Sequence, residues 1–435
     1  MKAQSVTILL TILLLISSFS SIGITIPIST SAEESTIYVD DDNSIGPWDG
    51  SIQHPYNSIT DALNVAANNQ PIFVYSGEYK ESIIINKNVK ITGENKNETV
   101  IRGTVEIQQT SNVIFSNFSI TVNDQSISDS AGITLNQTEK TQINNNIITK
   151  HNIGILITKE SKNNLIKENL ITQNNIGLDI CSSSLNLIYG NQIIKNQKTN
   201  IILYYSEQNI ITQNLIQNAE NNLQFHTSKD TINQNYWGSS KNIQIFTGQR
   251  SVQSLNIVIP WIKILFHPLT SSDQISINTL AIMDTSLGSM TLELYKDQMP
   301  ITTKNFIDLS HLDFFNNLVF HRVINDFVIQ GGGYDINGDN KESPLGTIPL
   351  ETHPDITHVD GSISMARTND PNSATSQFFI CDGDQHGLDE NYAAFGIILS
   401  GFETLRSIAS VETTRKNFMD DWPVEDVVIN NVVII

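Results

Sequence analysis

The chain has 435 residues, and its 25 Lys and Arg against 45 Asp and Glu give a formal net charge of −20. At roughly 100–200 residues per domain, this length predicts two or three domains, each large enough to bury a core. The hydrophobic fraction of 39% argues against a disordered acidic chain. The negative charge argues against nucleic acid or an anionic membrane surface as the main partner.

The chain has two cysteines, Cys181 and Cys381, which lie 200 residues apart, each within an apolar strand pattern. This spacing and setting favour buried free thiols over a disulfide. Two cysteines are also too few for a disulfide scaffold or a Cys-rich zinc site.

The first 32 residues have the composition of a secretory signal peptide. Lys2 precedes an apolar run from Val6 to Ile16, and the small residues Thr30, Ser31 and Ala32 stand before Glu33 at the expected cleavage point. We therefore expect cleavage after Ala32 and export to an extracellular, cell-surface or periplasm-like compartment. The alternative is an uncleaved anchor, and only in that case do we expect the protein to be held at a membrane.

Residues 36–270 contain a repeat with a period of 21 to 23 residues. The pattern Ile-x-x-Asn recurs with its asparagines at Asn146, Asn169, Asn191, Asn214 and Asn235. A second apolar register keeps the same step at Ile155, Leu178, Ile201 and Leu223. The period is short, and β-branched residues and Asn replace the usual helix formers, so the repeat predicts short strands.

These strands are expected to form a solenoid in which the inward Ile and Leu of one coil stack on those of the next. We expect each corner Asn to adopt left-handed φ and to bond the next amide in a ladder. The amphipathic segment 58–67 is expected to be a helix that covers the first coil. These features resemble the right-handed parallel β-helix of the pectate-lyase-like superfamily, which implies a fold but no particular activity.

After a polar linker at residues 271–278, the asparagine repeat ends and the sequence pattern changes. Over residues 279–435, strands, helices and Gly-rich turns alternate: Met290–Tyr295 has the alternation of a strand, and a helix is expected to start at Pro300. The chain therefore divides into a repeat domain and a second globular domain.

Several segments of residues 279–435 are similar in order and spacing to the cyclophilins, which are peptidyl-prolyl cis-trans isomerases. They are Leu318–Gly333, which contains Phe-His-Arg and three glycines, then Gly361–Ala366, Ser376–Ile380 and Leu388–Gly396. The resemblance implies a closed eight-stranded antiparallel β-barrel capped by two helices. The whole chain is thus expected to be mainly β.

The resemblance also implies the site residues. Arg322 is expected to be catalytic, and the substrate-binding residues are expected to be Phe327, Val328, Phe379 and Leu388 around the proline ring, Gln330 and Gln377 as polar orienting groups, Ala366, Arg367 and Thr368 along the substrate backbone, and Tyr392. No metal or other cofactor is required. Gly387 stands where many eukaryotic members have tryptophan, so we expect weak or no sensitivity to cyclosporin.

These residue types suit the chemistry of proline isomerisation. Rotation about an X–Pro bond loses amide resonance against a barrier of about 18–20 kcal/mol. An apolar pocket can hold the ring, while a rigid and permanently charged guanidinium can favour the twisted amide over the planar one. Proline-containing polypeptides are therefore the expected substrates.

Three functions stay open at this point. The leading one is an exported isomerase that assists folding of secreted or envelope proteins, with the repeat domain as a scaffold or as a surface for a glycan or an envelope protein. The second is an adhesion protein whose cyclophilin domain only binds peptides. The third is a carbohydrate-active repeat domain, although the acidic residues of the coils share no register.

Near Asp335, an Asp-x-Asn-Gly-Asp segment superficially resembles a calcium loop, but it lacks the final Glu of an EF-hand. A solvated turn is the preferred interpretation.

Overall fold

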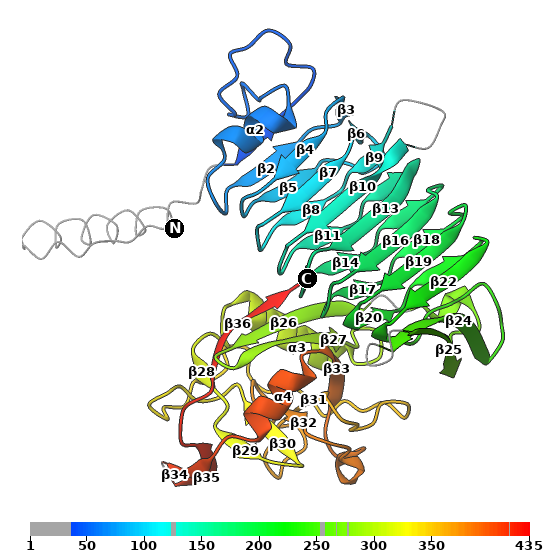
Figure 1. The fold of residues 1–435 in the computed structure, drawn as a ribbon. Coiled ribbons are helices and arrows are strands. Elements are labelled where there is room, and N and C mark those ends of the chain that lie inside the picture. The colour runs from blue at the N-terminus through cyan, green and yellow to red at the C-terminus, as the bar shows by residue number, and fades with distance from the viewer. Residues whose placement is uncertain (1–35, 123–127, 253–256, 267, 276–277, 417) are drawn as a thin grey trace, which may run out of the picture. The chain divides into compact units, whose positions relative to one another are not determined.

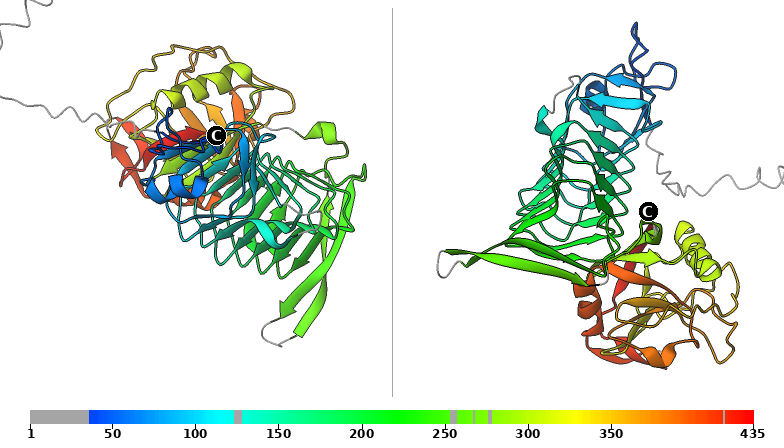
Figure 2. Two further views of the ribbon diagram at one scale, coloured as in Figure 1. Left: turned by 90° about the horizontal axis from the view of Figure 1, so that it is seen from above. Right: turned by 90° about the vertical axis from the view of Figure 1, so that its right-hand side faces the viewer.

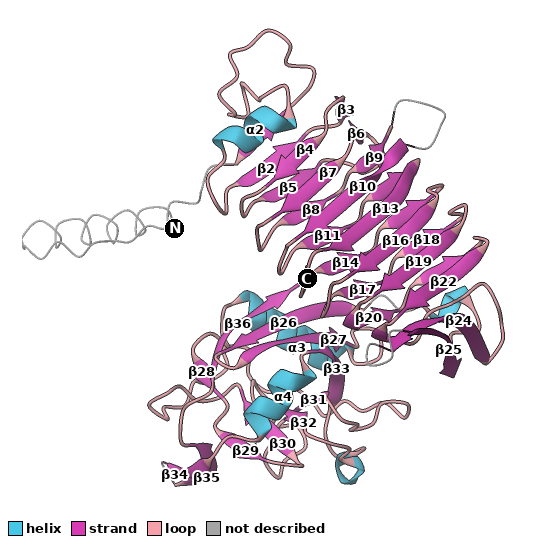
Figure 3. Cartoon of the chain, viewed as in Figure 1, coloured by secondary structure: helices cyan, strands magenta, loops and turns pink. Residues whose placement is uncertain are grey.

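The computed structural model describes residues 36–435, apart from 123–127, 253–256, 267, 276–277 and 417. The expected signal peptide at 1–32 lies outside the described residues. Among the described helices, none combines the length and the apolar character needed to cross a bilayer. The protein is mainly β with few helices (Figure 3).

The N-terminal region is a parallel β-solenoid in which strands of successive coils lie side by side (Figure 1). The first sheet consists of β1 (Ile37–Val39), β2 (Pro71–Val74), β5 (Lys90–Gly93), β8 (Ile114–Ser116), β11 (Gln142–Asn144), β14 (Leu165–Lys167), β17 (Leu187–Tyr189), β20 (Glu207–Thr212) and β23 (Lys229–Ile232).

Two further sheets complete the coils. One consists of β3 (Gly77–Tyr79), β6 (Thr99–Arg102), β9 (Ser119–Thr121), β12 (Ile147–Thr149), β15 (Leu170–Thr172), β18 (Gln192–Ile194) and β21 (Leu215–Gln217). The other consists of β4 (Ile83–Ile85), β7 (Val105–Gln108), β10 (Ser128–Asn136), β13 (His151–Thr158), β16 (Ile176–Cys181), β19 (Thr199–Tyr204), β22 (Asn221–His226), β24 (Ile243–Val252) and β25 (Ile257–Phe266).

The strand registers confirm the repeat. Ile155 pairs with Leu178, Leu178 pairs with Ile201, and Ile201 pairs with Leu223, as their 22- or 23-residue step predicts. These side chains are buried and belong to one continuous core that runs through the coils. Because each coil covers only its neighbours, the core exists only when several coils stack.

The expected asparagine ladder is present. The side-chain oxygen of Asn191 accepts from the backbone N–H and the Nδ2 of Asn169, at 3.0 Å each, and the Nδ2 of Asn191 donates to Asn214 Oδ1 at 3.0 Å. The predicted backbone conformation was wrong by one residue. Left-handed φ falls on the residue before each ladder asparagine, as at Glu168 and Gly190, because that residue makes the corner while the asparagine points inward.

The two ends of the stack differ. At its start, helix α2 (Ile59–Val65) buries Ile59, Ala62 and Leu63 on the first coils, with Ser58 as N-cap, which confirms the expected covering helix. At its other end, β24 and β25 form an antiparallel hairpin in place of another coil, and the hairpin extends away from the stack (Figure 2).

The C-terminal region contains a curled antiparallel sheet. In the described part of the chain it has nine strands, in the order β28 (Leu318–Val319), β36 (Val428–Ile434), β26 (Thr279–Thr285), β27 (Gly288–Leu294), β33 (Ala394–Ser400), β31 (Ser362–Met365), β32 (Phe378–Cys381), β30 (Val328–Gly331) and β29 (Arg322–Ile324). A separate hairpin consists of β34 (Thr413–Lys416) and β35 (Met419–Pro423). The strand pairings of the described residues alone do not close this sheet into the expected eight-stranded barrel.

Helices α3 (Pro300–His311) and α4 (Phe402–Ala409) pack against this sheet, and their Phe306, Leu309 and Leu405 enter its core. Short 3₁₀ turns η2 (Ser272–Gln274) and η3 (His386–Leu388) lie in the loops. The two cysteines are free, as expected. Cys381 is buried, but Cys181 is only partly buried, so the expected burial was wrong for Cys181.

Candidate active site

The side chain of Arg322 lies at the edge of the curled sheet, beside a cluster of apolar side chains. Arg322 begins β29 and pairs with Gln330 of β30. Its Nη1 donates to Gln330 Oε1 at 3.5 Å, and Gln330 Nε2 donates to Gln377 Oε1 at 3.1 Å. The guanidinium carbon lies 5.8 Å from the centre of the Phe327 ring. The two glutamines and the ring thus restrict where the guanidinium can point.

The expected pocket residues form a cluster of their own, separate from the core of the sheet. Val328, Phe379 and Cys381 are its buried members, and the partly buried side chains packed against them are Phe327, Ala366, Leu388 and Tyr392. Phe378, next to Phe379, faces the other way into the core, as the alternation of a strand predicts. An apolar patch with partly exposed walls therefore lies next to a guanidinium.

The three residues expected along the substrate backbone lie at the end of β31. Ala366 N–H donates to Gln377 O at 2.9 Å. Arg367 Nε donates to Asn391 O at 2.9 Å, and its guanidinium lies 4.6 Å above the ring of Tyr392. Thr368 is exposed and its hydroxyl donates to Ser373 Oγ at 2.8 Å. Arg367 is thus held against the pocket wall by stacking and a hydrogen bond.

The electrostatics of the site depend on a buried histidine. His321, next to Arg322, is 4% exposed, and burial lowers its pKa to about 4. It is therefore neutral at pH 7 and places no second positive charge beside the guanidinium.

The position of Gly387 is open. Within the described part of the chain, a Cβ added there would meet no heavy atom within 4 Å. Gly387 lies in η3, next to Leu388, so this side of the pocket lacks the wall that a larger residue would supply. The expected weak cyclosporin sensitivity stays a prediction.

Sequence reasoning missed three polar residues behind the pocket: His358, Ser364 and Asp389. Their side chains form a hydrogen-bonded chain next to Phe379. They come from three separate segments with no regular spacing, so only the folded sheet brings them together.

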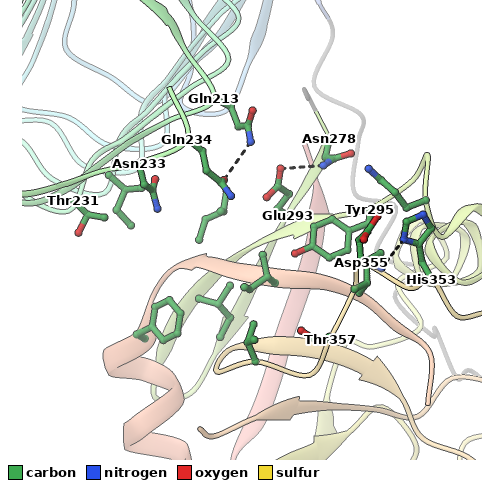
Figure 4. Close-up of a pocket in the computed structure, with 18 residues that line it drawn as sticks. Gln213, Thr231, Asn233, Gln234, Asn278, Glu293, Tyr295, His353, Asp355 and Thr357 are labelled. Atoms are coloured by element: carbon green, nitrogen blue, oxygen red, sulfur yellow. Dashed lines mark hydrogen bonds between the residues drawn. The ribbon is translucent and has the colours of Figure 1, made fainter. Parts of the chain in front are cut away.

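A cavity of about 610 Å³ lies elsewhere and includes none of the expected site residues (Figure 4). Its wall contains Glu293, whose Oε1 accepts hydrogen bonds from Asn278 Nδ2 at 3.0 Å and from the Tyr189 hydroxyl at 2.9 Å. Burial raises the pKa of Glu293. The polar side chains around it include Gln213, Gln234 and Tyr295.

The chain matches two family models in separate regions. A model described as cyclophilin type peptidyl-prolyl cis-trans isomerase/CLD matches residues 280–434. A model described as periplasmic copper-binding protein (NosD) matches residues 51–252. The described residues contain no group of three or more His, Cys, Asp or Glu side chains that could hold a metal ion.

Curated relatives are similar to the C-terminal region over most of their own length. A peptidyl-prolyl cis-trans isomerase of Acinetobacter baylyi is 38% identical over 160 residues, covering 36% of this chain and 85% of the relative. Peptidyl-prolyl cis-trans isomerase B of Escherichia coli is 35% identical over 158 residues, covering 34% of this chain and 96% of the relative.

Among solved structures, a cyclophilin type isomerase of Cryptosporidium parvum determined in the presence of the dipeptide Ala-Pro is 30% identical. The alignment covers 36% of this chain and 98% of that chain, with a TM-score of 0.31.

Proposed function

Because the chain belongs, through its C-terminal region, to the cyclophilin-type peptidyl-prolyl cis-trans isomerases, we propose that it is an exported isomerase that assists folding of secreted or envelope proteins. The observation that carries this proposal is the placement of Arg322 beside the apolar cluster of Val328, Phe379 and Leu388. The coil stack would serve as a scaffold or a binding surface.

The proposed mechanism needs no nucleophile. The substrate proline ring enters the apolar cluster and leaves water, while the segment around Ala366 holds the chain on either side of it. Arg322 then donates to the X–Pro amide as it twists and loses resonance. Because this hydrogen bond strengthens with the twist, it lowers the barrier and does not merely tighten substrate binding.

Gln330 and Gln377 support this mechanism by orientation. Their chain of hydrogen bonds ends on Nη1 of Arg322, so the guanidinium is held in place before substrate arrives. A preorganised donor costs no reorganisation at the transition state. His321 is neutral beside Arg322, so the guanidinium has no second positive charge next to it.

We further propose that the curled sheet is a closed barrel of eight strands. Its two end strands, β28 and β29, are separated in the chain only by Phe320 and His321. Counted as one bent strand over residues 318–324, they join the two ends of the sheet and reduce nine strands to eight. Closure would remove exposed strand edges and fix the rim on which Arg322 stands.

Export is supported by two independent features. The first 32 residues have the pattern of a signal peptide, and the family model that matches residues 51–252 is described as periplasmic. The proteins on which the isomerase acts would therefore also lie outside the cytoplasm.

The test is isomerisation of a short Xaa-Pro peptide by the full chain and by Arg322→Ala. We expect the variant to lose about 10²- to 10³-fold in kcat/KM, as when one transition-state donor is removed. Arg415→Ala is the matched control, because Arg415 is an exposed arginine outside the pocket, and it should retain wild-type activity.

Equal, slow rates in the wild type and in Arg322→Ala, both folded, would overturn the catalytic proposal. Peptide binding without turnover would then support the adhesion alternative. Release of reducing or unsaturated sugar by the coil stack would support the carbohydrate-active alternative.

A second role, glycan binding by the coils, is favoured by an exposed aromatic cluster. Tyr204 and Tyr205 are 43% and 40% exposed, and Tyr204 stacks on His226 at 5.0 Å. Exposed tyrosines present a flat apolar face with a polar tip, which suits binding surfaces. Tyr204→Ala with Tyr205→Ala should abolish retardation by pectin in affinity electrophoresis, whereas Trp48→Ala, another exposed aromatic, should not.

A further inference from the structure

A chain of three polar side chains, the buried His358 and Ser364 and the partly buried Asp389, lies behind the proposed proline pocket. His358 Nδ1 and Asp389 Oδ1 are 2.8 Å apart, and the backbone N–H of His358 donates to the same oxygen at 2.7 Å. On the other side of the ring, His358 Nε2 lies 3.0 Å from Ser364 Oγ. The imidazole and the hydroxyl are almost completely buried.

Each end of this chain is attached to a wall of the pocket. Asp389 directly follows Leu388 and is the C-cap residue of η3. Ser364 pairs with Phe379 across β31 and β32. The imidazole itself stacks on the Phe379 ring, with centres 5.9 Å apart and planes at 16°, and Phe379 meets Tyr392 edge to face at 5.6 Å.

We propose that His358 is a positioning residue for the isomerase site: by joining Asp389 to Ser364, it sets the distance between Leu388 and Phe379 and so the width of the proline pocket. The inference rests on the proposed pocket. It adds a residue that touches no substrate but determines how well the ring is held.

The order Asp–His–Ser is also that of hydrolytic triads, but the position of the serine excludes that use here. Ser364 lies within β31 between β32 and β33, and its exposed fraction is 0%. A nucleophile has to reach a substrate carbonyl. Ser364 is therefore an anchor for the imidazole.

The hydrogen bonds require one form of the imidazole. Asp389 accepts, so Nδ1 carries the proton, and Nε2 is left to accept from the hydroxyl of Ser364. A second proton on Nε2 would reverse the hydrogen bond, so that the Ser364 oxygen accepts, and would place a positive charge in a buried site. Burial lowers the pKa of His358 from its usual value of 6.5, which favours the neutral form.

The groups that face the imidazole are few. Two of them lie at η3: Asp389 favours the charged form of the His358 imidazole, and His386 opposes it. From β31 comes Ser364, and from β32 comes the ring of Phe379. His386 lies at the solvent side of this group, where its Nδ1 is 3.0 Å from Asp389 Oδ2 and its side chain is 58% exposed.

The test compares His358→Phe with His358→Gln in the full chain, with a short Xaa-Pro peptide as substrate. Phenylalanine keeps the stack on Phe379 but loses both hydrogen bonds. Glutamine can donate to Asp389 and accept from Ser364. We expect KM to rise about tenfold in His358→Phe, the size of a lost hydrogen bond to a charged group, and to recover most of the way in His358→Gln.

Three readouts separate positioning from general stability. kcat should stay within about twofold in both variants, because Arg322 is untouched. As the pH falls below 6.5, KM should rise in the wild type but not in His358→Gln. The ¹⁵N shifts of His358 should report a proton on Nδ1 and none on Nε2 at pH 7. His311→Gln, an exposed histidine at the end of α3, is the matched control.

A wild-type KM in folded His358→Phe, or a proton on Nε2 at pH 7, would overturn the inference. These results differ from failure of the proposed function, which would appear as slow turnover by the wild type itself. A variant that fails to fold is replaced by Ser364→Ala, which removes the anchor alone and should raise KM in the same direction.

Discussion

Single buried histidines make the free energy of unfolding of this protein depend on pH. His151, at the start of β13, is 0% exposed, and burial lowers its pKa to about 4. In the unfolded chain a histidine titrates near 6.5. Between these values the unfolded chain takes up a proton that the folded chain does not, so the free energy of unfolding falls as the pH falls from 6.5 towards 4.

We expect His151→Leu to remove much of this acid sensitivity from the coil stack. The lowered pKa corresponds to roughly 3 kcal/mol between pH 7 and pH 4. Urea unfolding at both pH values, followed by circular dichroism, measures the difference. An equal pH dependence in the wild type and the variant would contradict the prediction. His321 should act in the same way in the C-terminal region.

Another single substitution, Gln330→Leu, should slow catalysis without unfolding the protein. Leucine keeps the volume but removes the acceptor that holds Arg322 Nη1 and the donor to Gln377. We expect kcat to fall about tenfold, the size of one lost hydrogen bond to a charged group. Gln385→Leu, at the loop before η3, is the control of the same type and should leave kcat unchanged. An unaltered kcat in Gln330→Leu would mean that Arg322 is oriented by other groups.

Among the structural elements, the asparagine ladder shows how a solenoid satisfies its corners. Each inward side chain hydrogen-bonds to the coil before it and the coil after it, so backbone groups that a turn would leave unpaired are satisfied without water. The residue before each asparagine takes the left-handed conformation, and at one corner it is Gly190. The ladder therefore stabilises corners whose own backbone is unfavourable.

Replacing Asn191 by alanine should destabilise the stack strongly. Asn191 accepts from Asn169 and donates to the carbonyl of Ile166 and to Asn214. Leaving several buried groups unpaired, at about 1–3 kcal/mol each, should cost roughly 3–5 kcal/mol in total. Thermal unfolding measures the loss, and the exposed neighbour variant Gln192→Ala should change the melting temperature little. A small effect in both would show that water replaces the missing amide.

At the scale of the whole molecule, the described residues contain two large and separate hydrophobic cores. One runs through the coils, and the other fills the curled sheet and its two helices. The relatives from Acinetobacter baylyi and Escherichia coli match the second region over 85% and 96% of their own length. A region with its own core is expected to fold alone.

We therefore expect residues 279–435, produced alone, to retain kcat/KM within about twofold of the full chain on a short Xaa-Pro peptide. All proposed site residues lie between positions 322 and 392. Activity of the full chain with an inactive but folded fragment would show that the coil stack contributes to the site. A folded, active fragment would leave the coils free for a separate partner.

The sequence by itself determined the two regions, the repeat and its strand register, the ladder positions, the covering helix and the family of the C-terminal region. These depend on local periodicity and on segments of a known family, both of which can be read along the chain. Only the tertiary structure decided that the residue before each asparagine makes the corner, and that the stack ends in a hairpin. It alone brought His358, Ser364 and Asp389 together behind Phe379. That contact depends on how the strands curl. Unlike the asparagine ladder, it joins three segments that share no repeating spacing in the sequence.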